Sequence, residues 1–283
     1  MKHWLTTLIY FIGNIVFIAL RTIQILLFTE SETAFLKPDT MPVNIVFGVL
    51  GALLIGALFA TSLFKPRKLR EVEENSYPCL IISCLVGGLY LISGLISFMT
   101  NTSGIFTALV SVLAAATSVL YGFTEFKGYE FPRFGALFLV IVWAWEFILS
   151  YFYYTTRPLR LRTVLETFAI VFCILFFLSF AKLKSGVDQS RSAKLLYMSG
   201  LVASTLCFAS LVPEFIVWAV GKSANLTASC VSPAALLAGG IFAAFISLYC
   251  FKAADSNSIP DTADVSDDET EIFKVVNINV DEK

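Results

Sequence analysis

The fold is decided by fifty consecutive residues without a charged side chain, residues 75–124, which read NSYPCLIISCLVGGLYLISGLISFMTNTSGIFTALVSVLAAATSVLYGFT. The hydrocarbon core of a bilayer is about 30 Å thick, and roughly 20 apolar helical residues are needed to cross it. The stretch is therefore long enough for two crossings. The turn-forming sequence Asn101-Thr102-Ser103-Gly104 divides it near its middle. We expect two transmembrane helices joined by an abrupt hairpin.

The composition of the whole chain extends this expectation beyond the hairpin. Of the 283 residues, 57% are hydrophobic and 14% are charged, and the mean hydropathy is +0.80. Soluble domains carry about 25% charged residues, and the charges present here are too few to coat the surface of two globular domains. The composition argues against a soluble protein and favours a single polytopic membrane domain.

Gaps between ionisable residues locate the other spans. Three of these gaps are interrupted by one charge each, at Arg21, Glu146 and Glu166. The expected spans are residues 3–29, 40–64, two within 75–124, 134–156, 163–181, 195–213 and 223–251. The sequence thus predicts an all-α, polytopic transmembrane bundle of about eight helices. A bundle of seven is the alternative, and in it residues 163–181 are the weakest candidate span.

The basic residues of the loops predict the orientation of the bundle. With the N-terminus inside, the inner segments carry 12 Lys and Arg residues and the outer segments carry 5. Basic loops favour the cytoplasmic side, so we expect a cell-membrane protein with both termini in the cytoplasm. The exceptions are Arg157, Arg160 and Arg162, which fall in an outer segment.

The charge of the chain is divided between two regions. Residues 1–252 have a net charge of +6, and residues 253–283 have a net charge of −7. The first region is the predicted helical bundle, and the second is predicted to be a disordered, acidic cytoplasmic tail. This tail is the candidate contact for a cytoplasmic protein partner, whereas membrane lipid surrounds the bundle. The basic residues form no stripe or module that would bind nucleic acid. In the loop at residues 65–74 we expect at most a short interfacial helix.

No motif in the sequence indicates catalysis, a cofactor or a metal. The six cysteines form no CxxC motif, and the one histidine is His3 at the N-terminus. Metal sites of the common kinds require clusters of these residues. We therefore expect no metal site, no cofactor and no enzymatic activity.

The most informative residues are polar side chains inside the predicted spans. The candidate ligand or proton site comprises Glu146, Arg21, Gln24, Glu166, Glu214 and Trp143. The span boundaries place these residues in one layer toward the outer face. Glu146 is the deepest charge, about 20 Å from the inner boundary if the helix rises about 1.5 Å per residue from Arg133. A carboxylate at that depth is usually turned toward the protein interior, and it is protonated or paired.

The layer has a second interpretation, which is interfacial anchoring. Arg21, Glu166 and Glu214 lie near enough to the outer interface to reach headgroups or water. Arg162 precedes Glu166 by four residues, a spacing that allows an ion pair on one helix face. The three acids, Arg21 and the outer arginines would together form one balanced polar network that opens outward.

Small residues form a stripe on the last predicted span. Ala235, Gly239, Ala243 and Ser247 recur at every fourth position. Such stripes let two helix backbones approach closely. The stripe is either a seam between helices of one chain or the face of a homo-oligomer.

The stretch FTESETAFLKPD, residues 28–39, follows one hydrophobic helix and precedes another. With its flanking helices it resembles the first hairpin of polytopic membrane proteins from anaerobic Gram-positive bacteria. The resemblance covers this hairpin alone and implies no activity. Two functional classes follow from the residues: a non-catalytic accessory, sensor or assembly protein, and a transporter or small-solute or ion binder that uses the polar layer around Glu146. A third class, an intramembrane enzyme, would need acid chemistry from Glu146 or Glu214.

Overall fold

The computed structural model describes most of the chain outside its loops and its C-terminal tail. The described residues are 3–29, 41–63, 67–69, 77–100, 104–132, 134–155, 161–186, 189–222, 226, 229, 231–249 and 251–253. The predicted acidic tail lies outside this set, apart from its first residue, 253.

The described residues form eight helices and two short strands, so the predicted all-α bundle is confirmed. The helices are α1 (His3–Phe28), α2 (Met41–Leu63), α3 (Tyr77–Thr100), α4 (Gly104–Lys127), α5 (Gly135–Thr155), α6 (Leu161–Lys184), α7 (Gln189–Ala219) and α8 (Pro233–Tyr249). The strands are β1 (Arg67–Leu69) and β2 (Phe251–Ala253).

Seven of the helices, α1 to α7, are long and apolar enough to cross a membrane. The expectation that residues 163–181 would be the weakest span is wrong, because the span Arg162–Lys184 in α6 has a mean hydropathy of 2.4. The shorter helix is α8, with 17 residues. At about 1.5 Å per residue it is about 25 Å long, slightly less than the thickness of the hydrocarbon core.

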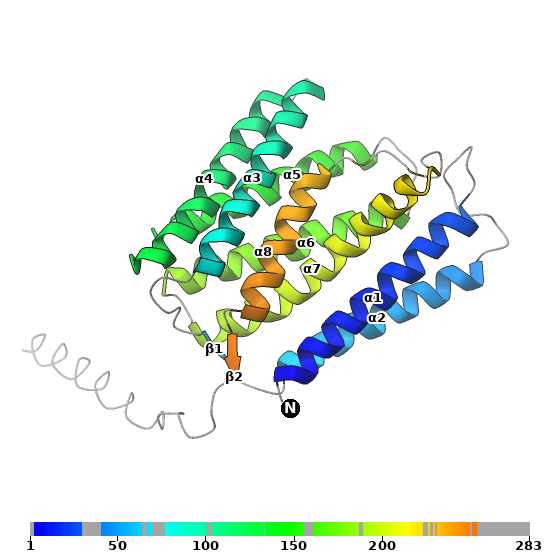
Figure 1. Ribbon diagram of the computed structural model, residues 1–283, viewed down its shortest axis with the longest axis horizontal. Helices are drawn as coiled ribbons and strands as arrows, with labels where there is room; N and C mark the ends of the chain where they lie inside the picture. Colours follow the sequence, from blue (N-terminus) through cyan, green and yellow to red (C-terminus); the bar gives the residue numbers. More distant parts are fainter. Residues whose placement is uncertain are drawn as a thin grey trace, which may run out of the picture.

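Helix α7 lies at the centre of the bundle. It packs against α1, α2, α6 and α8, and α3 and α4 form the predicted hairpin (Figure 1). Helix α8 lies between α3 and α7, and α5 packs on α4 and α6. The pair α1 and α2 joins the rest mainly through α7, so one polar side chain on α7 is able to meet side chains from both halves of the bundle.

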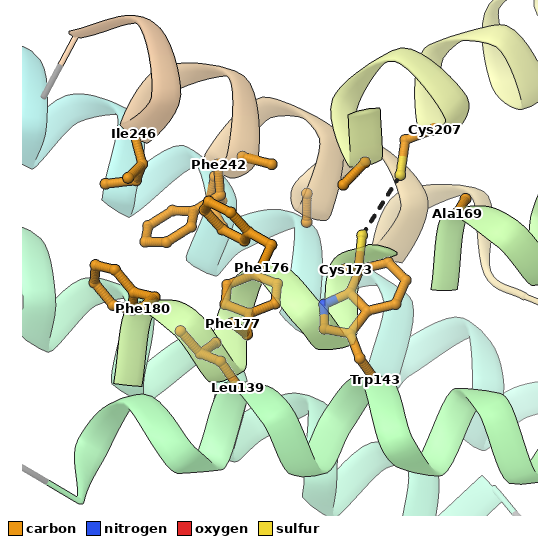
Figure 2. Close-up of a cluster of buried hydrophobic side chains, with 14 of the residues drawn as sticks. Leu139, Trp143, Ala169, Cys173, Phe176, Phe177, Phe180, Cys207, Phe242 and Ile246 are labelled. Carbon is orange, nitrogen blue, oxygen red and sulfur yellow. Dashed lines mark hydrogen bonds between the residues drawn. The ribbon is translucent and has the colours of Figure 1, made fainter. Parts of the chain in front are cut away.

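Aromatic side chains fill the core between α6 and α8. Phe176, Phe177 and Phe180 lie on one face of α6 and surround Phe242 of α8 (Figure 2). The rings of Phe177 and Phe242 are stacked, with their centroids 5.7 Å apart. The ring of Phe180 meets that of Phe242 edge-on, with their centroids 5.8 Å apart. Offset-stacked and edge-to-face arrangements are those that aromatic rings prefer.

The small-residue stripe of α8 is buried inside the single chain. Ala235, Ala243 and Ser247 are at most 2% exposed. An added Cβ at Gly239 would lie 2.2 Å from Cζ2 of Trp143 on α5. The stripe thus forms a close seam between helices of one chain, the first of the two alternatives above.

Strands β1 and β2 connect the α2–α3 loop to the segment after α8. They pair antiparallel, with Arg67 opposite Ala253 and Leu69 opposite Phe251. The expectation of at most an interfacial helix at 65–74 is wrong for residues 67–69, which are extended. In Figure 1 both strands lie at the end of the bundle where α1 begins. The boundary that the charge pattern places after residue 252 falls within β2.

Candidate functional site

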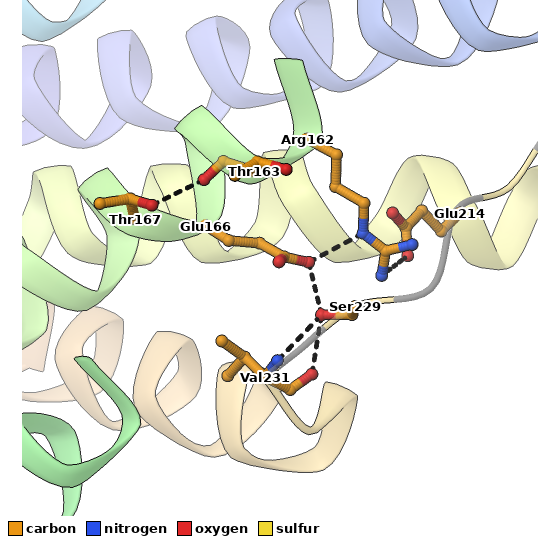
Figure 3. A network of polar contacts seen from close by, with 7 residues as sticks. All are labelled: Arg162, Thr163, Glu166, Thr167, Glu214, Ser229 and Val231. Atoms are coloured by element: carbon orange, nitrogen blue, oxygen red, sulfur yellow. Dashed lines mark hydrogen bonds and ion pairs between the residues drawn. The ribbon is translucent and has the colours of Figure 1, made fainter. Parts of the chain in front are cut away.

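The guanidinium of Arg162 joins two glutamates that lie on different helices. Its Nε donates to Oε1 of Glu166, one turn further along α6, at 2.8 Å. Its Nη2 lies 2.6 Å from Oε2 of Glu214 on α7 (Figure 3). The predicted i,i+4 pair is present, and Arg162 also connects α6 to α7. The side chains of these three residues are between 1% and 14% exposed.

Ser229 adds the loop before α8 to this arrangement. Its hydroxyl donates to Oε1 of Glu166 at 2.6 Å, and the backbone N–H of Val231 donates to the same hydroxyl at 3.2 Å. We call Arg162, Glu166, Glu214 and Ser229 the Arg162 cluster. The cluster joins three chain segments through charge-assisted hydrogen bonds, which are roughly twice as strong as neutral ones.

Arg21 and Gln24 form a polar link between α1 and α2. Nη1 of Arg21 donates to Oε1 of Gln24 at 2.6 Å, and Nε2 of Gln24 donates to Oδ1 of Asn44 on α2. The guanidinium carbon of Arg21 also lies 5.9 Å from the centroid of the Phe47 ring. Arg21 is near enough to the Arg162 cluster for its charge to interact with those of Glu214 and Glu166. The predicted layer therefore comes together from α1, α2, α6 and α7.

Glu146 is buried in α5, where its side chain is 4% exposed. Helix α5 packs on α6, and Glu166 of α6 is near enough for its charge to act on the Glu146 carboxylate. Among the described residues, which do not include 156–160, no hydrogen bond or ion pair reaches its carboxylate. The structure confirms that the side chain is turned into the bundle rather than toward lipid.

Trp143 belongs to the hydrophobic core rather than to the polar layer. It is completely buried, and its indole N–H donates to the hydroxyl of Tyr90 on α3 at 3.0 Å. Its ring stacks on Phe177 with centroids 6.4 Å apart, and Gly239 lies against it. The sequence places Trp143 one turn before Glu146, but its contacts explain it as a packing residue that positions α5.

Two partners in the layer were not anticipated. Asn44 and Ser229 are uncharged and lie at the edges of spans, so no charge marks them in the sequence. The only signal was their type, since short polar side chains are expected to bond nearby polar groups. Arg157 and Arg160, which the sequence assigns to the same network, lie outside the described residues.

Another ion pair lies at the opposite end of α6. Lys184, in its last turn, pairs with Glu125 of α4 and lies 5.2 Å from the centroid of the Tyr121 ring. The two ends of α6 are therefore both fixed by charges. The layer around Glu146 differs because it includes a carboxylate beyond those that Arg162 binds.

The described part of the layer consists of charged and hydrogen-bonding groups. Among the described residues, no group of three or more His, Cys, Asp and Glu side chains is arranged to hold a metal. The layer contains carboxylates, guanidiniums, two amides and a hydroxyl in a largely buried setting, where each charge interacts strongly with its neighbours. Such a layer can hold a proton, an ion or a small polar solute.

Comparisons with known proteins found no family model, curated protein or solved structure that matches this chain.

Proposed function

We propose that this protein is a non-catalytic sensor or accessory protein of the cell membrane, in which the charged layer around Glu146 binds a small solute or ion from the outside. The observation that carries the proposal is the burial of Glu146 beside Glu166, with no cation bound to it in the described part of the chain. Burying a charge without a partner costs several kcal/mol. Side chains that carry this cost inside a membrane are functional candidates by default.

The carboxylate of Glu146 favours a cationic ligand or a proton. In the described part of the chain, Arg162 binds Glu166 and Glu214, whereas no cation is bound to Glu146. A bound cation or a proton would neutralise its charge. The acidic tail would then report the bound state to a cytoplasmic partner. It is linked to the bundle through β2, which pairs with β1 of the α2–α3 loop.

The proposed orientation places the layer on the outer side and both termini in the cytoplasm. The 12 to 5 ratio of basic residues supports it. The pairing of β1 with β2 is compatible with it, because the two segments that pair are both expected on the cytoplasmic side. The predicted association of the tail with a cytoplasmic protein depends on this orientation.

A thermal-shift screen tests the proposal. The purified protein is melted with individual ions and small metabolites, in parallel with Glu146→Gln and with Glu125→Gln, whose carboxylate belongs to the ion pair at the other end of α6. We expect at least one cationic compound to raise the melting temperature of the wild type and of Glu125→Gln but not of Glu146→Gln. A ligand whose effect survives in Glu146→Gln would contradict the proposed site.

A transporter is the second candidate, and Pro213 favours it. This proline lies inside α7, next to Glu214. Proline lacks the N–H that would bond the carbonyl of Ala209, four residues earlier, which weakens the helix at that point. Weakened helices beside a charged site are typical of transporters. Flux of a ligand from the screen into proteoliposomes would establish transport, and binding without flux would favour the sensor.

A further inference from the structure

A small pocket opens beside the Arg162 cluster, between the last turns of α7 and the start of α8. Its volume is about 260 Å³, and it is lined by Leu211, Glu214, Phe215, Trp218, Leu226 and Pro233. Five of these six side chains are apolar, and Glu214 is the one charged group among the described residues of the wall. Binding sites for small organic molecules commonly combine a mostly apolar wall with a few polar groups that fix the orientation of the ligand.

The side chain of Glu214 belongs both to the Arg162 cluster and to the wall of the pocket. Oε2 accepts from Nη2 of Arg162, whereas in the described part of the chain no hydrogen bond reaches Oε1. The side chain of Glu214 is 14% exposed, and it lines the pocket. A hydrogen-bond acceptor with negative charge is therefore present at the inner wall of an apolar cavity.

The outer wall of the pocket faces the bilayer. Phe215 and Trp218 are 55% and 67% exposed, and they lie on α7, one of the helices long enough to span. On a spanning helix such exposed aromatic side chains contact lipid. A ligand would reach Glu214 sideways from the membrane rather than through the centre of the bundle.

We propose that this pocket binds an amphiphile that carries an ammonium group, whose charge pairs with Glu214 and whose apolar chain lies against Phe215 and Trp218. The proposal rests on the proposed function, because Glu214 belongs to the same charged layer, and it names the class of ligand. Two features support a cation over other groups. The wall carries the carboxylate of Glu214, whose Oε1 accepts no hydrogen bond from the described residues, and an indole ring attracts cations through its face.

Ligands without an ammonium group fit the pocket less well. A neutral acyl chain would fill the apolar part and leave Oε1 of Glu214 without a partner. An anionic headgroup would face the carboxylate directly and would have to compete with it for Arg162, which already binds Glu166 and Glu214. These two classes serve as the comparison ligands in the test.

The experiment measures saturable binding of decyltrimethylammonium to the full chain in lipid nanodiscs, with empty nanodiscs subtracted. Decanol and decyl sulfate carry the same chain with a neutral or an anionic head. The variants are Glu214→Gln, Leu226→Trp and Glu146→Gln. Leu226→Trp fills the pocket and retains the Arg162 to Glu214 pair, so its result does not depend on that pair.

We expect saturable binding of the ammonium that exceeds the binding of decanol and decyl sulfate. Glu214→Gln should weaken it at least about tenfold, which is about 1.4 kcal/mol, and should leave decanol unchanged. Leu226→Trp should abolish it. Equal binding of all three ligands, or ammonium binding that is unaffected by Leu226→Trp, would overturn the proposal.

The Glu146→Gln arm separates this proposal from the proposed function. If Leu226→Trp has no effect while Glu146→Gln removes the thermal response to an ion, the pocket is wrong and the charged layer stands. If both variants leave every ligand response unchanged, both proposals fail.

Discussion

Arg162 of α6 and Glu214 of α7 form an ion pair of 2.6 Å that closes the end of the bundle where α8 begins. The same guanidinium binds Glu166, so one cation holds two carboxylates from neighbouring helices. Arg21, on a third helix, adds its charge from nearby. The layer is therefore both a structural connection and the proposed site, and the two roles can be separated by substitution.

Replacing Arg162 should lower the free energy of unfolding. Arg162→Leu removes the cation that binds the buried Glu166 and the half-buried Glu214, and breaking a buried pair in this way costs about 3–5 kcal/mol. Lys222→Leu removes a cation from an exposed loop position and should change the free energy of unfolding by less than about 0.5 kcal/mol. Equilibrium unfolding in mixed micelles measures both, and equal effects would show that the cluster does not stabilise the fold.

The seam between α5 and α8 should be sensitive to a single methyl group. Gly239→Ala places a Cβ against the Trp143 ring, and overpacking of this kind costs about 1–3 kcal/mol. At Gly56 an added Cβ meets nothing within 4 Å, so Gly56→Ala should be neutral or slightly stabilising. Melting temperatures of the two variants provide the comparison. An unchanged melting temperature in Gly239→Ala would mean that α8 does not pack closely against Trp143.

Two truncations separate the tail from β2. Ending the chain after Ala254 removes only residues beyond β2, and we expect normal expression and an unchanged melting temperature. Ending it after Tyr249 also removes the partner of β1, which should lower the melting temperature by several degrees. If the truncation after Ala254 already lowers the melting temperature by several degrees, part of the tail folds onto the bundle.

Reporter fusions test the orientation. Fusions after Arg70, Lys184 and Lys283 should report the cytoplasm, and fusions after Asp39 and Lys222 should report the outside. A cytoplasmic signal at Lys222 or an outside signal at Lys184 would contradict the proposed topology.

Much of the fold could be predicted because hydrocarbon excludes charge. Uncharged gaps locate helices, and the depth of a residue follows from its distance along the span. That is why Arg21, Glu166 and Glu214 were expected in one layer. The Arg162 to Glu166 pair was also predictable, because its geometry depends on a single helix.

The remaining features depend on contacts between distant segments. Nothing in residues 67–69 or 251–253 alone indicates that they pair. The pairing of Arg162 with Glu214 depends on the angle between α6 and α7. The packing role of Trp143 is evident only once Gly239 of α8 is seen to lie against its ring. The shortness of α8 was missed because the gap 223–251 includes a loop that is as uncharged as the helix.

The most direct test of the central claim is chemical access to position 146 from the outside. Glu146→Cys and Phe147→Cys are made in a chain whose six native cysteines have been replaced, and intact cells are treated with a small cationic methanethiosulfonate. The two positions are adjacent, but Phe147 is 36% exposed and Glu146 is buried beside the polar layer. We predict that the cysteine at 146 reacts at least about ten times faster than the one at 147, because the reagent follows the charged layer and does not enter lipid. An unreactive cysteine at 146, or one that reacts only from the cytoplasmic side, would contradict an outward-facing site at Glu146.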